Sequence, residues 1–170
     1  MDTETEINKA LFDINDMKVI SDWEVSVNNC CGGGGTGQEF YTNLKISGNS
    51  GGNKWYAAIS GECWIKAIFT KPSPVCLLRM KSANDVPDRD PYNIRVLGKG
   101  NRNDSEYFTI KEFYALPFTE RYQFIDLNLD NEKAVEEIKI VITANRSFAE
   151  QRHWGSGTQL AEVEFYEFKQ

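Results

Sequence analysis

The sequence predicts an all-β fold, an antiparallel jelly-roll β-sandwich of about eight strands with a short N-terminal helix. Three observations lead to this prediction. Apolar and polar side chains alternate along most of the chain, which is the period of a half-buried strand. These runs are rich in Val, Ile, Phe, Tyr and Trp, and clusters of Gly, Asn, Asp, Ser and Pro separate them. Helical spacing is found near the N-terminus, so one peripheral helix accompanies the strands.

Residues 1–20 are expected to form a helical segment packed against the body of the domain. Thr3 and Glu6 make a capping-box pattern, in which the hydroxyl and the carboxylate each take a backbone N–H of the first turn. Ile7, Leu11 and Ile14 follow at helical spacing and give one narrow apolar face. Contact of this face with a partner protein is the alternative.

The strands are expected in the alternating runs that follow the helix. These are Trp23–Val27, Trp55–Ile59, Cys63–Phe69, Val75–Lys81, Tyr92–Leu97, Tyr107–Phe113, Gln123–Leu129, Glu137–Thr143 and Gln159–Phe168. No linker or change of composition divides them, so we expect one domain over residues 1–170. Within these strands Trp23, Trp55 and Trp64 are predicted to lie in the core.

Composition excludes several classes of function. The chain has 170 residues and a net charge of −6, from 19 basic and 25 acidic side chains. That is the wrong sign for a protein that neutralises phosphates, so no nucleic-acid partner is expected. No run approaches the ~18 apolar residues of a membrane span. The acidic start lacks the apolar region of a secretory signal, so we expect a cytoplasmic monomer, extracellular only if another route exports it.

The four cysteines are expected to stay reduced. Cys30 and Cys31 are adjacent, which is not the spacing of a zinc site, and the chain offers only one histidine. Small buried thiols are the first interpretation. A bridge between Cys63 and Cys76 is the alternative, because these two residues fall on neighbouring predicted strands.

The segment Ser82–Gly98, SANDVPDRDPYNIRVLG, is the most informative part of the chain. It describes a strand that ends, a tight polar loop and a strand that begins again. Asn84 and Asp85 end the first strand because their side chains can bond the backbone two residues further on. Pro87 and Pro91 fix φ and donate no hydrogen bond, which keeps the turn out of a sheet.

Arg89 lies between Asp88 and Asp90 and near Asp85, and its guanidinium is expected to bind a carboxylate and brace the loop. The same arginine would hold these carboxylates ionised, which suits bracing better than proton transfer. His153 is the only histidine, and no G-x-S-x-G motif or histidine cluster occurs. The protein is therefore not expected to be an enzyme.

This segment resembles the discoidin, or coagulation-factor type C, group of galactose-binding-like β-sandwiches, in the variant with an RDP loop. Asn53–Phe69 is similar to the family's T-K-W loop and the following strand with its buried tryptophan, and Thr158–Phe168 is similar to its closing strand. The resemblance covers residues 20–168. It implies that residues 1–170 form one galactose-binding-like domain, an eight-stranded jelly roll with a ligand face at the loops of one end.

The resemblance also implies a structural calcium site. The family builds it from an Asp-Gly turn, the T-K-W loop and the glutamate of the closing strand, which correspond here to Ser47, Asn53 and Glu162. Ca²⁺ prefers six to eight oxygen ligands with one or more carboxylates, and serine in place of aspartate removes a charge. We therefore expect a weak or empty site and no required cofactor. Glu162 is otherwise expected on an exposed strand or paired with Lys54.

The loop between the last two predicted strands, Ala144–Thr158, is the candidate ligand surface. A sugar is bound when an aromatic ring covers its apolar face and polar groups fix its hydroxyls. The predicted ligand-binding residues come from this loop and from the RDP loop: Asn145, Arg146, Arg152, His153, Trp154, Asn84, Asp85 and Arg89. Phe148 belongs to the same loop. The alternative for Trp154 is a plug at the bottom of the sandwich, with His153 an ordinary surface residue.

Two functions follow from the resemblance. The first is a non-catalytic, lectin-like module that binds carbohydrate through the loops of one end. The second is an intracellular protein-interaction domain that uses the same loops. The missing signal, the free thiols and the weakened calcium site favour the second function. The fold alone does not decide between the two, since this sandwich hosts many functions.

Overall fold

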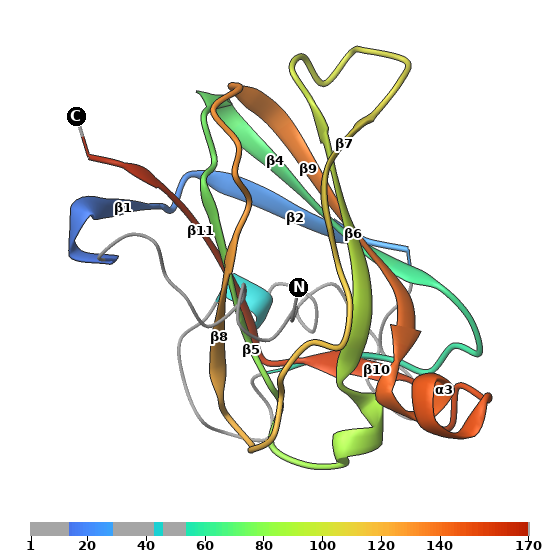
Figure 1. The fold of residues 1–170 in the computed structure, drawn as a ribbon. Coiled ribbons are helices and arrows are strands. Elements are labelled where there is room, and N and C mark those ends of the chain that lie inside the picture. Colours follow the sequence, from blue (N-terminus) through green and yellow to red (C-terminus); the bar gives the residue numbers. More distant parts are fainter. Residues whose placement is uncertain (1–13, 29–42, 46–53, 170) are drawn as a thin grey trace.

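The computed structural model describes residues 14–28, 43–45 and 54–169 as a β-sandwich (Figure 1). One sheet has five strands in the order β2-β4-β9-β6-β7: Trp23–Val27, Cys63–Ser73, Val135–Asn145, Pro91–Lys99 and Phe108–Phe113. The other has four strands in the order β1-β11-β5-β8: Met17–Ile20, Glu162–Phe168, Leu77–Lys81 and Phe124–Asn128. A two-stranded sheet pairs β3, Trp55–Ala57, with β10, Thr158–Leu160. Every pairing is antiparallel, which confirms the predicted all-β sandwich.

The core forms where the alternating side chains of the two large sheets meet. Phe165 of β11 is fully buried, and it contacts Trp23 and Phe69 edge to face at centroid distances of 5.0 and 5.3 Å. Both partners belong to the opposite sheet, so these rings join the two layers. Truncation of a buried Phe of this kind to Ala costs about 3–5 kcal/mol.

Two of the three tryptophans predicted in the core are there, and the third is not. Trp23 and Trp55 are buried. Trp64 lies on the outer face of the five-stranded sheet, where the ammonium groups of Lys66 and Lys139 are each 5.0 Å from its ring centre. The reason is the alternation of β4: the side chain of Ile65 next to it points into the core, so Trp64 faces the other way.

The predicted helix within residues 1–20 lies mostly outside the described residues. Its end is described and is not α-helical. Ile14–Asp16 form a single 3₁₀ turn, and Met17–Ile20 form strand β1, which pairs with β11. The prediction of a helical segment is therefore wrong for Met17–Ile20. The backbone of the neighbouring strand β11 supplies hydrogen-bond partners there that no sequence period reveals.

The last predicted strand, Gln159–Phe168, is divided between two sheets. Ala161 separates β10 from β11, and its N–H donates to the Lys81 carbonyl at 2.9 Å. As a result β10 pairs with β3 while β11 pairs with β5.

Within the described residues a helix also replaces part of a predicted loop. Helix α3, Arg146–Gln151, follows β9 directly. Among all the residues that the structure describes, no helix is long and apolar enough to cross a membrane.

Cys63 and Cys76 are free and buried, which confirms the first interpretation of these thiols. Cys63 pairs with Ile142, close to α3, whereas Cys76 receives the N–H of Leu129 at the far end of the sandwich. The alternative of a bridge between them is therefore wrong, because Cys63 begins β4 of one sheet, Cys76 directly precedes β5 of the other, and the two cysteines lie at opposite ends of the sandwich. Cys30 and Cys31 lie outside the described residues.

Candidate functional site

The two segments predicted to bind ligand meet at one end of the sandwich. We call this region the loop end and define it as residues 84–90 and 145–158. The first segment contains the 3₁₀ turn η3, Pro87–Arg89, and the second contains α3. Helix α3 packs against η3, and Figure 1 shows both at the same end, beside β10.

Asn145 holds the second segment in place. Its side-chain oxygen accepts from the Phe148 N–H at 2.8 Å, which caps α3. Its amide nitrogen donates to the carbonyls of Trp154 at 2.9 Å and Gly157 at 2.8 Å. The residue is 0% exposed, so the predicted ligand contact at Asn145 is replaced by a positioning role.

Gly157 explains how closely this loop approaches strand β3. Its φ is +120°, and a Cβ at this position would stand 2.3 Å from the Ala57 carbonyl oxygen. Only glycine combines this backbone conformation with this contact. The approach brings the loop beside Tyr56, whose hydroxyl donates to the Ser156 carbonyl.

Arg89 joins the two segments, although its partners differ from those expected. Its Nε donates to Ser156 Oγ at 2.9 Å, and its guanidinium lies 4.5 Å from the centre of the Tyr56 ring. Its Nη1 is 3.4 Å from Gln159 Oε1. The expected bracing of Arg89 with a neighbouring carboxylate is therefore wrong, because Asp85 and Asp90 are bound by other cations.

Asp85 is bound by Lys54. The Lys54 ammonium lies 2.9 Å from Asp85 Oδ1 and 3.0 Å from Gln159 Oε1. Gln159 in turn donates to the Asp85 carbonyl at 2.6 Å. The hydrogen bond from Lys54 lowers the pKa of Asp85 below its ordinary value. The expected pairing of Lys54 with Glu162 is therefore wrong.

Asp90 is bound by Arg121, which sequence reasoning did not select. Both guanidinium nitrogens of Arg121 reach the carboxylate, one of them at 2.9 Å. Asp90 is fully buried, and burial raises its pKa despite the arginine. The Asp90 carbonyl also accepts from the Arg146 N–H at 2.8 Å, so the RDP loop is tied to the start of α3.

Asn84 and Arg146 each carry a buried polar atom without a partner. Among the described residues nothing donates to Asn84 Oδ1, and nothing accepts from Arg146 Nε. The remaining groups of Arg146 are engaged: Nη2 donates to the Phe118 carbonyl, and Nη1 lies 3.6 Å from Glu150. Close by, Val86 has a φ of +41°, which is strained for a β-branched residue.

Arg152, His153 and Trp154 form the outward-facing part of the loop end. Arg152 and His153 are exposed, and Arg152 ends α3 in a left-handed conformation. His153 Nδ1 accepts from the Gly155 N–H at 3.2 Å, which orients the ring. Trp154 is half-buried and stacks on Phe148 with ring centres 5.1 Å apart. One ring therefore supports the other at the surface.

The described part of the predicted calcium set is a poor fit to a divalent cation. Glu162 is buried, and the ammonium of Lys81 lies 3.3 Å from its Oε1. That charge already neutralises the carboxylate. Ser47 and Asn53 lie outside the described residues. Among the described residues no group of three or more His, Cys, Asp or Glu side chains is placed to hold a metal ion. Calcium therefore stays a prediction.

Sequence reasoning missed one residue within the loop end, Ser156, and three that contact it from outside: Tyr56, Gln159 and Arg121. Tyr56 and Gln159 alternate as ordinary strand residues, and Arg121 lies outside both predicted loops. Their roles arise from the β3–β10 pairing and from the approach of the two segments. Neither is encoded in local spacing.

Comparison with solved structures identifies the fold as that of F5/8 type C, or discoidin-like, domains, which confirms the predicted resemblance to this group. The assignment to the variant with an RDP loop stays a prediction. The F5/8 type C domain of a Bacteroides fragilis protein matches with 15% identity and a TM-score of 0.69, covering 91% of this chain and 99% of that chain. The family 32 carbohydrate-binding module of Clostridium perfringens NanJ, solved with galactose, matches with 14% identity, TM-score 0.66 and coverage of 89% and 99%.

A fucose-binding module from Streptococcus pneumoniae matches with 15% identity and a TM-score of 0.64, again covering 89% of this chain and 99% of that one. No protein-family model and no curated protein sequence matches the chain. The structural neighbours are thus non-catalytic carbohydrate-binding and lectin domains, at identities that establish the fold.

Proposed function

We propose that this protein is a non-catalytic carbohydrate-binding module that takes its ligand at the loop end. The observation that carries the proposal is the outward-facing group Arg152, His153 and Trp154, which directly follows the capped helix α3 and is held to it by the stacking of Trp154 on Phe148. An aromatic ring beside cationic and imidazole donors is the combination that binds a sugar ring and its hydroxyls. The structural neighbours that bind galactose and fucose support the same class of ligand.

The buried network behind these residues supports the proposal because it preorganises the surface. Arg89 and Asp85 of the first segment are each tied to the second segment or to β10. Asp90 and Arg146 fasten the base of α3. A ligand then meets side chains that lose little freedom on binding, which favours affinity.

Titration calorimetry with a panel of neutral and acidic glycosides tests the proposal. Arg152→Ala and His153→Ala are expected to weaken binding about tenfold or more, which corresponds to about 1.4 kcal/mol. Arg102→Ala is the matched control, because Arg102 is an exposed arginine in the hairpin between β6 and β7. Absence of binding to galactosides, mannosides and acidic glycans, or an equal loss of affinity in the Arg102→Ala control, would overturn the proposal.

The alternative is an intracellular protein-interaction domain that uses the same loops. The free, buried thiols of Cys63 and Cys76 favour it, because such thiols persist in a reducing compartment. One stoichiometric partner recovered from cell extract, and lost with Trp154→Ala, would decide for this function. Cell fractionation tests the expected cytoplasmic location directly.

We further propose that the domain is a monomer that binds no nucleic acid. The net charge of −6 supports the absence of nucleic-acid binding. Light scattering coupled to gel filtration measures the oligomeric state, and a gel-shift assay at low salt measures nucleic-acid binding.

A further inference from the structure

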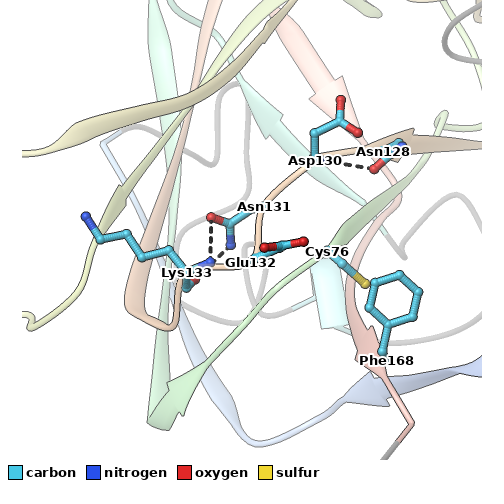
Figure 2. Close-up of a pocket in the computed structure, with 7 residues that line it drawn as sticks. All are labelled: Cys76, Asn128, Asp130, Asn131, Glu132, Lys133 and Phe168. Atoms are coloured by element: carbon cyan, nitrogen blue, oxygen red, sulfur yellow. Dashed lines mark hydrogen bonds between the residues drawn. The ribbon is translucent and has the colours of Figure 1, made fainter.

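A cavity of about 660 Å³ lies at the end of the sandwich opposite the loop end. Its walls come from the start of β5, the turn between β8 and β9 and the end of β11. The lining residues, drawn in Figure 2, are Cys76, Asn128, Asp130, Asn131, Glu132, Lys133 and Phe168. The same strands reach the loop end only at their other termini. The volume is that of a small-molecule site, which ranges from about 300 to 1,000 Å³.

The turn that forms one wall is held rigidly. Asn131 Nδ2 donates to the Val75 carbonyl at 3.0 Å and to the Lys133 carbonyl at 2.8 Å. The Asp130 N–H donates to Asn128 Oδ1 at 2.9 Å, and Figure 2 shows this bond. A wall fixed in this way is already in its bound conformation, so binding orders little of it.

Asn128 offers a donor that nothing in the described chain uses. The residue is only 7% exposed, and its Oδ1 is taken by Asp130. Its amide nitrogen has no acceptor among the described residues. This nitrogen does not belong to the buried polar atoms without a partner, so water reaches it, and a ligand acceptor can take the place of that water.

An aromatic ring and a carboxylate complete the set. Phe168 is 44% exposed, and Figure 2 shows its ring beside the buried Cys76. Glu132 is exposed, and its carboxylate makes no ion pair with the described residues. An apolar ring, an amide donor and a carboxylate acceptor match the apolar face and the hydroxyls of a sugar ring.

The charges around the cavity define the class of sugar. Lys111 lies against Asp130 and donates to the Asn128 carbonyl at 3.1 Å. Lys133 points away from the other lining side chains in Figure 2, and its ammonium lies 4.5 Å from the Phe108 ring centre. Lys111 therefore neutralises Asp130 of the lining, and the Glu132 carboxylate is left without an ion pair among the described residues. An anionic ligand is repelled and a neutral one is not.

We propose that this cavity is a second carbohydrate site, specific for a neutral hexopyranose unit and separate from the loop end. The proposal rests on the proposed function, since it assigns the same class of ligand to a second surface. Two sites at opposite ends let one domain bridge two glycan chains, and on a surface dense in glycans this raises avidity without new contacts.

Amide-detected NMR on the full chain tests the second site. Methyl β-galactoside, methyl α-glucoside and methyl α-mannoside are the neutral probes, and N-acetylneuraminic acid is the acidic comparator. We expect a neutral probe to shift the side-chain amide signals of Asn128 and Asn131, and the acidic sugar to leave them in place. Phe168→Ala and Glu132→Gln are expected to weaken this response about tenfold, whereas His153→Ala does not change it. Glu106→Gln, at an exposed carboxylate before β7, is the matched control.

The outcomes separate the two proposals. Shifts at the loop end alone would overturn the second site and leave the proposed function standing. NMR shifts of the Asn128 side-chain amide that Phe168→Ala abolishes would support the second site, even if no signal of the loop end shifts. Absence of shifts at both ends with every probe would overturn both. Equal binding of N-acetylneuraminic acid at the cavity would overturn the assigned class of sugar.

Discussion

Arg121 binds both carboxylate oxygens of Asp90, and this buried pair lies where the RDP loop meets the start of α3. The loop end is therefore held by an ion pair that joins the region after β7 to the RDP loop. Because Asp90 is fully buried, its charge depends on this single arginine for most of its compensation.

Arg121→Met is expected to lower the free energy of unfolding by about 3–5 kcal/mol near neutral pH, because it leaves a buried carboxylate unpaired. Urea titration measures this loss. The double variant Arg121→Met with Asp90→Asn is the control, and it is expected to recover part of the loss because no charge remains buried. Equal stability of the single variant and the native chain would contradict the role assigned to the pair.

The same variant has a defined pH dependence. Burial raises the pKa of Asp90, so the folded state binds this proton more tightly than the unfolded state. The stability from the protonated form is present at low pH and lost as the pH rises through the folded pKa. Removal of Arg121 raises the pKa of Asp90 further, so the variant gains more stability than the native chain when Asp90 is protonated. The difference in free energy of unfolding between Arg121→Met and the native chain is therefore expected to narrow from about pH 7 to about pH 5. A constant difference over that range would contradict the assigned role of Arg121.

Lys54→Met is expected to raise the pKa of Asp85 toward its ordinary value. The hydrogen bond from Lys54 lowers the pKa in the native chain, so the bond stabilises the fold above the unfolded pKa and is lost as the pH falls through the folded pKa. Carbon-detected NMR titration of the Asp85 carboxyl measures the shift. Lys18→Met, on β1, is the control, and an unchanged Asp85 titration in Lys54→Met would contradict the contact.

Gly157→Ala is expected to disrupt the pairing of β3 with β10, because the added Cβ would meet the Ala57 carbonyl at 2.3 Å. Gly61→Ala is a matched control: its φ of +148° is also unfavourable for alanine, but nothing lies within 4 Å of the new Cβ. We expect the Gly157 variant to lose more stability than the control by about 1–3 kcal/mol in urea titration, because only its Cβ overlaps a neighbouring atom. Equal losses would show that backbone conformation alone matters at both positions.

Iodoacetamide is expected to leave Cys63 and Cys76 unmodified in the folded protein and to label both in denaturant. Burial raises the pKa of Cys63 to about 12 and raises that of Cys76, so little thiolate exists at mildly alkaline pH. Peptide mass spectrometry reads each site separately. Rapid labelling of Cys63 in the native state would contradict its placement in the core.

The strands and their core residues follow well from the sequence, because alternation is a local property. Trp23 and Phe165 occupy the buried positions that a period of two assigns to them. The same rule, applied strictly from Ile65, places Trp64 outside, so this error came from the size and apolar character of tryptophan rather than from the pattern.

Other features could not be predicted because they depend on contacts distant in sequence. Strand β1 exists because β11 offers it a partner. Helix α3 is only six residues long, too short for a period, and its signal is the capping residue Asn145. In the loop end, the sequence places Arg89 among three aspartates, yet the fold directs it to Ser156 and Tyr56. The hydrogen-bond partners of Arg89 are therefore set by the approach of the two segments and not by its neighbours in the chain.

The indole N–H signal of Trp154 tests glycan binding at the loop end most directly. The chain has four tryptophans, so a Trp154→Phe variant assigns this signal in a nitrogen–proton spectrum. Titration with a bound glycoside is expected to shift the Trp154 signal and to leave that of the fully buried Trp55 in place. A glycan that binds the protein without moving the Trp154 signal would contradict the proposed site.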